Sequence, residues 1–342
     1  MGIVYQLPSL VDEKQLQSVV RILDATLPSS AQRGVVFYLG QTRNGPPPID
    51  DVEKIVGGTI PKTYRRVFHL PFTSRYVDPR FRLDDPQSDQ VLRPYLDLAH
   101  RLECKSVIVH TGTNYYHPQA ILPAGTDPQY QWGNRSPAQL EQSRRDVYRR
   151  LRSFAVTYPF SIALENSPFP KNVGSAGGDF TRFFLNPLAT TEAQIKDFVA
   201  YAKYASRRLG VCLDTNHYLR MLSTLQFYDH QDPAVQALFA AVGEERDSSA
   251  LLPLTQHLLD EARLFVVQFA DNTGWHPEKK SLNATAPRTH AHQLRLLVDM
   301  IDSHPQLVPL SVEVDEMDYL DRPRQQKTLE WILSGVETPL TE

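Results

Sequence analysis

The chain has 342 residues, of which 41% are hydrophobic and 22% are charged, so it can bury one large α/β domain or two smaller ones. A formal net charge of −3 and a pI near 6.4 give no sign of the basic surface that binds nucleic acid or anionic membranes. Cys104 and Cys212 lie in apolar stretches and are predicted to be reduced core residues, which favours a cytoplasmic location over a disulfide-bonded secreted protein.

Eight short runs rich in β-branched and aromatic residues are predicted to be strands. In chain order they are 3–7, 34–39, 66–70, 106–110, 160–165, 210–214, 264–268 and 309–314. Segments with helical periodicity lie between them, for example at 12–27, 89–102, 137–157, 191–209, 257–262 and 290–303. Eight alternations of strand and helix predict an α/β protein with a parallel sheet closed into a (β/α)8 TIM barrel.

The chain exceeds the ~250 residues of a minimal barrel, so enlarged loops are expected on the C-terminal rim. Three candidates follow the fourth, fifth and sixth strands, at 111–136, 166–190 and 215–256. We interpret them as walls or lids over a pocket, the alternative being surface decoration or an oligomer contact. Because no linker or repeat divides the chain, residues 1–336 are predicted to form a single barrel domain, with 337–342 as a C-terminal tail.

Four of the later strands end in side chains that bind hard cations: Glu165, Asp214, Gln268 and Glu313, spaced by roughly 50 residues. A polar residue at the end of a buried strand is costly unless it faces a site. One such glutamate alone would be a helix cap or the partner of an arginine. Four in series predict one divalent metal site at the barrel mouth, and three carboxylates with an amide oxygen suit Mg²⁺, Mn²⁺ or Co²⁺.

Four histidines accompany this set. His69 and His110 end the third and fourth strands, His217 lies three residues after the strand-6 aspartate, and His276 follows the strand-7 glutamine. Each of them alone would more often be a hydrogen-bonded structural residue. His69 and His110 lie on neighbouring strands at the same height, which favours a shared role in binding substrate hydroxyls or a second metal.

This pattern of a strand-5 glutamate, a strand-6 Asp-x-x-His, a strand-7 ligand and a strand-8 glutamate resembles the xylose isomerase-like TIM-barrel superfamily of sugar isomerases, epimerases and endonuclease IV. The stretch around Gln268, Val-Gln-Phe-Ala-Asp-Asn-Thr-Gly-Trp-His-Pro, is similar to the hydroxypyruvate isomerase branch. The resemblance implies metal ligands Glu165, Asp214, Gln268 and Glu313. It implies that Glu165 and Glu313 are also the catalytic acid/base pair, and that His217 and His276 touch substrate.

The function predicted in this way is a metal-dependent isomerase or epimerase of a sugar, keto acid or polyol that works through an enediolate. The metal would spread the developing negative charge, while the two glutamates exchange the proton from opposite faces. A small-molecule substrate is the expected partner, and a homo-oligomer is compatible with such a barrel. Neither a secretion signal, a lipid anchor nor an apolar run of ~18 residues is evident, so no membrane partner is expected.

Two alternatives stay open. An endonuclease IV-like zinc phosphodiesterase acting on abasic DNA would use the same strand ends, but Gln268 replaces a histidine and the nearest match to an Asp-Arg-His segment is 287–290. The arginine-rich stretch 144–152 is predicted to lie on an outward-facing helix, so nucleic acid is not the expected partner. The third interpretation is a non-catalytic barrel that binds a sugar-like ligand.

Overall fold

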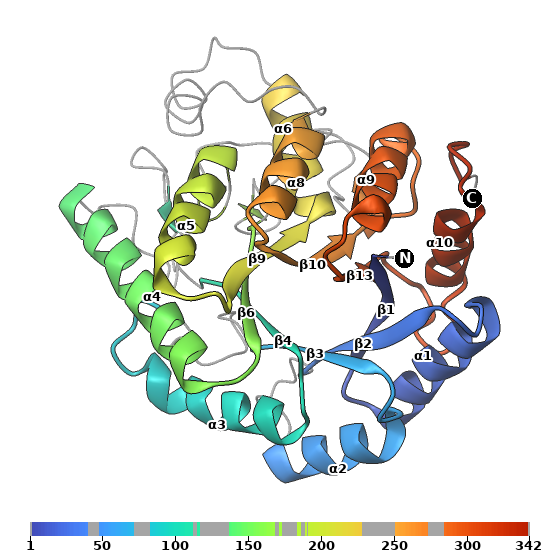
Figure 1. Cartoon of the computed structure of the whole chain (residues 1–342), viewed down its shortest axis with the longest axis horizontal. Helices are drawn as coiled ribbons and strands as arrows, with labels where there is room; N and C mark the ends of the chain where they lie inside the picture. The colour runs from blue at the N-terminus through green and yellow to red at the C-terminus, as the bar shows by residue number, and fades with distance from the viewer. Residues whose placement is uncertain are drawn as a thin grey trace.

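Eight parallel strands close into a barrel in the order β1, β13, β10, β9, β6, β4, β3, β2 (Figure 1). The computed structural model describes residues 2–39, 48–71, 83–111, 115–116, 137–167, 171–172, 183–185, 189, 191–227, 250–272 and 284–340. The barrel strands are β1 (Ile3–Leu10), β2 (Gln32–Tyr38), β3 (Arg65–His69), β4 (Ser106–Val109), β6 (Ser161–Glu165), β9 (Leu209–Asp214), β10 (Leu264–Phe269) and β13 (Val308–Val312). All eight predicted strands are present, and the predicted TIM barrel is confirmed.

Helices surround this barrel on the outside (Figure 1). They are α1 (Glu13–Thr26), α2 (Ile49–Thr59), α3 (Ser88–Arg101), α4 (Pro137–Thr157), α5 (Glu192–Ala205), α6 (Thr215–Phe227), α8 (Leu251–Asp260), α9 (Ala291–Ser303) and α10 (Pro323–Ser334). Among the described residues, no helix combines the length and apolar character needed to cross a bilayer.

The prediction of a loop over 215–256 is wrong at both ends. Helix α6 begins at Thr215, directly after β9, and α8 begins at Leu251 rather than at residue 257. The reason at the first end is a cap: the Asp214 carboxylate accepts a hydrogen bond of 2.8 Å from the backbone N–H of His217, which satisfies a free donor in the first turn. Residues 228–249 lie outside the described part of the chain.

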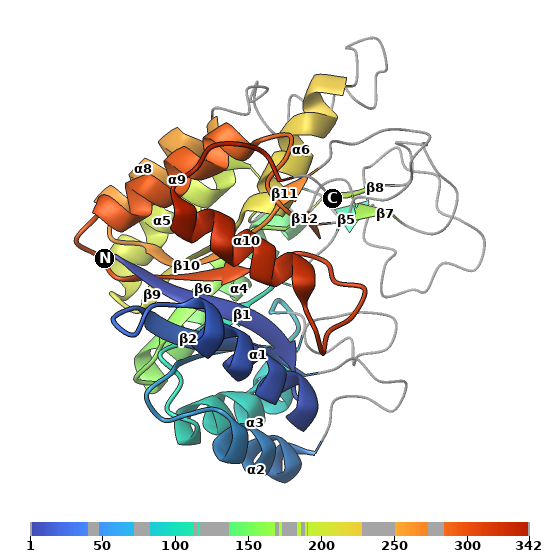
Figure 2. The same ribbon diagram turned by 90° about the vertical axis from the view of Figure 1, so that its right-hand side faces the viewer.

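The other two predicted insertions contribute a small sheet at one end of the barrel (Figure 2). Strand β5 (Tyr115–Tyr116) pairs with β8 (Phe183–Leu185), which also pairs with β7 (Lys171–Asn172), all antiparallel. A second short pair, β11 (Asp271–Asn272) and β12 (Ala284–Thr285), follows β10. The described residues therefore place secondary structure from several insertions near the same rim.

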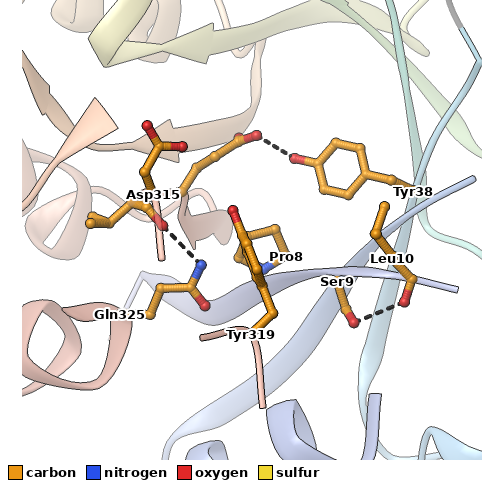
Figure 3. A pocket seen from close by; sticks show the side chains of 9 residues that line it. Pro8, Ser9, Leu10, Tyr38, Asp315, Tyr319 and Gln325 are labelled. Carbon is orange, nitrogen blue, oxygen red and sulfur yellow. Dashed lines mark hydrogen bonds between the residues drawn. The ribbon is translucent and has the colours of Figure 1, made fainter. Parts of the chain in front are cut away.

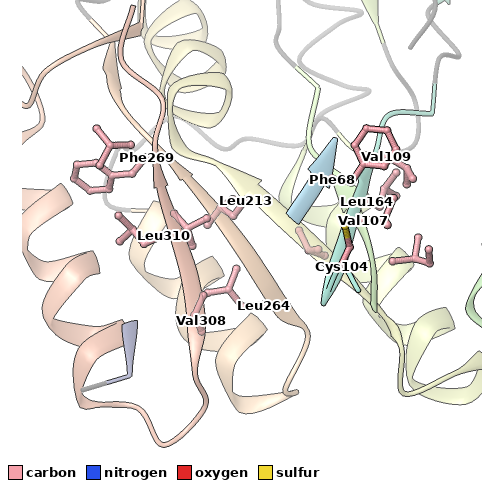
Figure 4. Close-up of a cluster of buried hydrophobic side chains, with 14 of the residues drawn as sticks. Phe68, Cys104, Val107, Val109, Leu164, Leu213, Leu264, Phe269, Val308 and Leu310 are labelled. Carbon is pink, nitrogen blue, oxygen red and sulfur yellow. The ribbon is translucent and has the colours of Figure 1, made fainter. Parts of the chain in front are cut away.

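Successive side chains of each strand point alternately into two apolar layers, one outside and one inside the barrel. Side chains that face outward, such as Phe68, Leu164 and Phe269, are fully or almost fully buried and pack in the layer between strands and helices (Figure 4). A separate cluster fills the barrel interior with one residue from each of six consecutive strands: Val36, Val67, Ile108, Ala163, Cys212 and Val266. This inner layer closes the barrel and forms a floor for what lies above it.

Candidate active site

A ring of polar side chains lies directly above the inner apolar layer. Because side chains alternate along a strand with a period of two, the next inward position lies two residues further on. In all six strands that position is polar: Tyr38, His69, His110, Glu165, Asp214 and Gln268. On β13 the corresponding alternation runs from buried Ser311 to Glu313. The strand register therefore gathers most of the predicted site residues at the C-terminal end of the barrel.

Glu165 is the centre of this ring and is buried. Its Oε2 lies 3.0 Å from His69 Nε2 and 3.1 Å from His110 Nε2, and its Oε1 lies 3.4 Å from His217 Nδ1. His69 and His110 also contact each other, with ring centroids 5.0 Å apart. The expectation that these two histidines are neighbours is confirmed, although in the strand register His69 pairs with Ile108 and His110 lies two residues further along.

The His69 ring is bonded at both nitrogens to oxygen atoms. Its Nδ1 lies 2.9 Å from the Leu70 carbonyl, which can only accept, and its Nε2 faces the Glu165 carboxylate. A neutral imidazole has one N–H to donate, so both contacts are hydrogen bonds only if the ring is an imidazolium. Burial opposes that charge, but the Glu165 carboxylate outweighs it and raises the pKa of His69. A cation between His69 Nε2 and Glu165 would satisfy the same two groups.

Asp214 is held in place by its neighbours on β6 and α6. The Asn166 side chain accepts from the Asp214 backbone N–H at 2.6 Å and donates to its carbonyl at 3.0 Å. His217 Nδ1 lies 2.9 Å from the Asn166 carbonyl and 3.3 Å from Asp214 Oδ2. A proton on Nδ1 leaves Nε2 as a bare lone pair. Burial lowers the pKa of His217 to about 4, so the ring is neutral near pH 7.

Glu313 follows β13 and reaches β2, the strand on the other side of β1. Its Oε1 accepts a hydrogen bond of 2.6 Å from the Tyr38 hydroxyl, and its Oε2 is buried without a hydrogen-bond partner in the described part of the chain. The Tyr38 hydroxyl in turn accepts from Gln268 Nε2 at 3.3 Å, and Gln268 Oε1 accepts from Cys212 Sγ at 3.1 Å. A continuous hydrogen-bonded chain thus joins β9, β10, β2 and β13.

A cavity of about 250 Å³ opens beside this chain, and Glu313 forms part of its wall (Figure 3). Its lining residues are Pro8, Ser9, Leu10, Tyr38, Glu313, Val314, Asp315, Tyr319 and Gln325. The dashed line from Tyr38 in Figure 3 is the bond to the Glu313 carboxylate, so this pair borders both the ring and the cavity. A small ligand in the cavity could therefore reach Glu313.

The carboxylates of the ring have different pKa values because their surroundings differ. Burial raises the pKa of Glu165, but His110 and His69 outweigh this and hold it well below its usual value of 4.5. Burial and then the charge of Glu165 raise the pKa of Glu313 to about 7. Burial, followed by the charges of Glu313 and Glu165, raises the pKa of Asp214 well above 3.8. Mutual repulsion among three acids is what a bound cation would relieve.

The donor set fits a divalent cation. Glu165, Asp214 and His217 each offer one ligand atom, and these atoms lie within 4.8 Å of one another. The same holds for His69, His110 and Glu165, so the two groups share Glu165. Glu313 belongs to neither group, but its Oε2 is a further buried oxygen without a hydrogen-bond partner among the described residues. Carboxylate oxygen and imidazole nitrogen suit Mg²⁺, Mn²⁺, Co²⁺ or Zn²⁺.

Of the predicted site residues, the structure brings Glu165, Asp214, His69, His110 and His217 into direct contact. Glu313 and Gln268 lie in the adjoining hydrogen-bonded chain. His276 lies outside the described residues.

Two residues of the site, Tyr38 and Asn166, were not predicted from the sequence. Each was visible as a polar side chain at a strand end, Tyr38 at the inward position of its strand and Asn166 directly after Glu165. A tyrosine in a strand is ordinarily explained by β-propensity alone, so its position carried no chemical signal.

Two other groups considered from the sequence lie apart from the ring. His290, in the 287–290 segment, is bonded through Nδ1 to Asp271 at 2.7 Å, and this buried pair joins β11 to the start of α9. The arginines of α4 are paired on the outside of the barrel: Arg144 with Glu141 and Asp197, Arg145 with Glu141, Arg149 with Asp146, and Arg150 with Asp89.

No protein-family model matches the sequence, and no curated protein sequence matches it either. Solved structures do resemble it. Mannonate dehydratase from Streptococcus suis serotype 2 has a TM-score of 0.55 at 12% identity, with 98% of this chain and 94% of that chain covered. A D-psicose 3-epimerase solved with D-fructose has a TM-score of 0.50 at 8% identity, with 97% of both chains covered.

A xylose isomerase-like TIM barrel/4-hydroxyphenylpyruvate dioxygenase fusion protein has a TM-score of 0.50 at 14% identity, and the match covers 98% of this chain and 42% of that one. This chain adopts the xylose isomerase-like TIM-barrel fold. The resemblance stated from the sequence is thereby confirmed for the fold. By their names these neighbours are enzymes, most of which act on sugars or sugar acids, and at such identities the likeness establishes the fold alone.

Proposed function

We propose that this protein is a divalent metal-dependent isomerase or epimerase of a sugar, or of a related keto acid or polyol. The observation that supports this best is the pair Glu165 and Glu313. They come from non-adjacent strands, β6 and the end of β13, and their environments push their pKa values apart, below 4.5 and to about 7. Two carboxyl groups separated in this way are suited to act as base and acid near neutral pH.

In this proposal Glu165, ionised and fixed by His69 and His110, takes the proton from the carbon beside the substrate carbonyl. Glu313, whose pKa of about 7 in the metal-free protein allows it to carry a proton near neutral pH, returns a proton to the opposite face of the resulting enediolate. Protonation at the same carbon inverts that carbon, and protonation at the neighbouring carbon moves the carbonyl. The neutral His217 ring offers a lone pair to a substrate hydroxyl. These roles need the two glutamates to face the substrate from different sides, and their positions on non-adjacent strands are compatible with that.

Glu165, Asp214 and Glu313 would hold the cation, with Gln268 as the neutral fourth ligand. When bound, a divalent cation supplies Lewis-acid stabilisation of negative charge on the substrate oxygens, worth several kcal/mol in such reactions. The buried carboxylates then serve two purposes, because the same groups that hold the cation also handle the proton. A small molecule entering through the cavity beside Glu313 is the expected substrate.

Proton exchange between substrate and solvent tests this proposal without knowledge of the final product. We expect the protein to wash deuterium from D2O into the carbon next to the carbonyl of one or more ketoses or keto acids, detected by NMR. Glu165→Gln and Glu313→Gln should each lower the exchange rate at least 10²-fold, because each removes one proton-transfer group. Glu141→Gln, on the outer helix α4, is the control and should exchange at the wild-type rate.

Exchange that persists in both ring variants would refute the two-carboxylate mechanism. Wild-type protein that binds sugars but exchanges no proton would favour the non-catalytic barrel.

A second candidate is a zinc phosphodiesterase, and the observation in its favour is the second candidate metal group. His69, His110 and Glu165 could hold a second cation next to a first one held by Glu165, Asp214 and His217. Two adjacent cations are typical of enzymes that hydrolyse phosphodiesters. Against DNA as the substrate, the arginine cluster of the described residues lies on α4 and is largely paired with acids. Elemental analysis separates the two: one exchangeable ion per chain favours the isomerase, and two or three tightly held zinc ions with cleavage of abasic DNA favour the nuclease.

A further inference from the structure

The hydroxyl group of Tyr38 touches two residues of the proposed metal site at once. It lies 2.6 Å from Glu313 Oε1 and 3.3 Å from Gln268 Nε2. Tyr38 is the last residue of β2, and it reaches Glu313 after β13 and Gln268 on β10, two strands that pair with each other on the far side of β1. One side chain therefore ties together two positions that arrive from different parts of the sequence.

The hydrogen-bonding capacity of these groups allows only one arrangement. A phenol has one proton to donate, and a Glu313 carboxylate that holds a cation is ionised and can only accept, so in the cation-bound form the Tyr38 proton points to Glu313. Tyr38 must then accept from Gln268, which requires the NH2 end of that amide to face the ring. The oxygen end of Gln268 is thereby turned the other way, where it accepts from Cys212 Sγ at 3.1 Å.

Tyr38 itself is firmly placed. Its backbone belongs to β2 and pairs in register with His69 of β3, and its ring lies 4.6 Å from the His69 ring, measured between centroids. A phenol, whose ordinary pKa is about 10, keeps its proton near neutral pH. A fixed, protonated hydroxyl is what a positioning role requires.

We propose that Tyr38 is a positioning residue that orients Glu313 and Gln268 for a hard divalent cation. This inference rests on the proposed function, in which those two residues are ligands. By binding Oε1 of Glu313, Tyr38 leaves Oε2, the buried oxygen without a partner, as the free ligand atom. By accepting from the Gln268 NH2 group, it selects the amide oxygen as the atom presented to a cation. Cys212 holds that oxygen through a weak thiol donor, which a cation can displace.

Removing the Tyr38 hydroxyl should therefore weaken metal binding without removing a ligand. Hydrogen-bond partners of metal ligands typically contribute 10- to 100-fold to metal affinity, because they fix the ligand's orientation. In Tyr38→Phe the Glu313 carboxylate would be free to rotate, and the Gln268 amide could turn its NH2 end toward the cation. The ring and its packing against His69 stay in place, so the fold should be little affected.

The experiment is a titration of the full-length, metal-stripped protein with Mn²⁺ alone, followed by electron paramagnetic resonance. We expect at least tenfold weaker Mn²⁺ binding in Tyr38→Phe, together with a changed spectrum of the bound ion. Tyr158→Phe is a matched control, since the Tyr158 hydroxyl also donates to a carboxylate at 2.6 Å, that of Asp97, outside the barrel interior. Its affinity and spectrum should equal those of the wild type. The melting temperature of each metal-free variant checks that it is folded.

The outcomes separate this inference from the proposed function. Wild-type protein that binds neither Mn²⁺ nor Mg²⁺, Co²⁺ or Zn²⁺ would overturn both. Wild-type binding with an unchanged affinity and spectrum in folded Tyr38→Phe would overturn the positioning role and leave the proposed function intact. An equal loss in Tyr38→Phe and Tyr158→Phe would also overturn it, because the effect would then be a general one.

Discussion

The two oxygens of Glu313 occupy different environments, and this difference determines what the residue can do. One accepts the Tyr38 proton, and the other is buried without a partner. Burial and the negative charge of Glu165 favour the protonated form of Glu313, which is why its pKa rises to about 7, whereas the pKa of Glu165, between two imidazoles, falls. Two residues of one amino-acid type thereby acquire opposite proton affinities.

This difference predicts how the stability of the metal-free protein depends on pH. A carboxyl whose pKa is raised from 4.5 to about 7 on folding stabilises the fold fully below pH 4.5, and that contribution is lost as the pH rises through 7. The free energy of unfolding of the wild type, relative to Glu313→Gln, should therefore fall by up to about 3 kcal/mol between pH 5 and pH 8. Urea titrations with EDTA at several pH values measure it.

The comparison with Glu313→Gln cancels groups whose pKa does not depend on Glu313, whereas changes at Asp214 and His69, whose pKa values the Glu313 charge raises, belong to the effect of Glu313 itself. His217, whose pKa is lowered to about 4, gains stability with rising pH in both proteins, so its effect cancels in the difference. The glutamine can still accept from Tyr38, which preserves the local hydrogen bond. A difference between the two proteins that is constant from pH 5 to 8 would show that Glu313 is ionised throughout, contrary to the prediction.

At single residues, chemical type and strand position could be read from the sequence, but the partners of each group could not. Glu165 was identified because a buried strand ends in a charge. Its contacts with His69 and His110 depend on the register of β3, β4 and β6, which pairs His69 with Ile108 and Ile108 with Ala163, so His110 and Glu165 lie two residues beyond the partners of His69. Tyr38 was not predicted because its hydroxyl bonds to Glu313, which lies 275 positions away in the sequence and follows the strand on the other side of β1.

At the scale of elements, strands were more predictable than helices. The barrel strands are apolar runs of β-branched residues, and their burial on both sides explains that composition. Helices α2, α6 and α10 were not among the predicted segments: α2 carries Gly57 and Gly58, α6 starts without any gap after β9, and α10 begins at Pro323 after Arg322 with φ of 51°. In each case the helix is stabilised by packing against the barrel more than by the helix propensity of its residues.

Replacing glycine by alanine should have opposite effects on stability in β2 and in α2. A Cβ on Gly34 in β2 would lie 2.4 Å from the Arg65 carbonyl oxygen and 2.5 Å from Gln6 Nε2, so Gly34→Ala should destabilise the barrel by about 1–3 kcal/mol. A Cβ on Gly57 in α2 meets nothing within 4 Å, and Gly57→Ala should stabilise by about 0.5–1 kcal/mol through helix propensity. Chemical denaturation of both variants measures these opposite signs, and a neutral Gly34→Ala would mean that β2 and β3 can separate at no cost.

At the scale of the molecule, the barrel concentrates acid at one end. Glu165, Asp214 and Glu313 meet there, whereas arginines of α4 are paired with acids on the outer surface. Burial of three acids is unfavourable in the metal-free protein, as the raised pKa values of Asp214 and Glu313 indicate. The closed barrel fixes the strand ends, so the folding free energy of the rest of the barrel offsets the unfavourable burial of these acids.

A cation that binds this end should therefore stabilise the whole fold, because the unfolded chain does not assemble the ligands. Binding at a free concentration 100 times the dissociation constant adds about 2.7 kcal/mol to the free energy of unfolding. For a chain of this length we expect the melting temperature of EDTA-treated protein to rise by about 5 °C when Mn²⁺ is added in that excess.

Asp214→Asn should lose most of this increase in melting temperature, although its side-chain oxygen can still cap α6. Asp89→Asn, at the Arg150 pair outside the barrel, should keep it. An equal rise in both variants would mean that Mn²⁺ stabilises the protein from some other place than the barrel end.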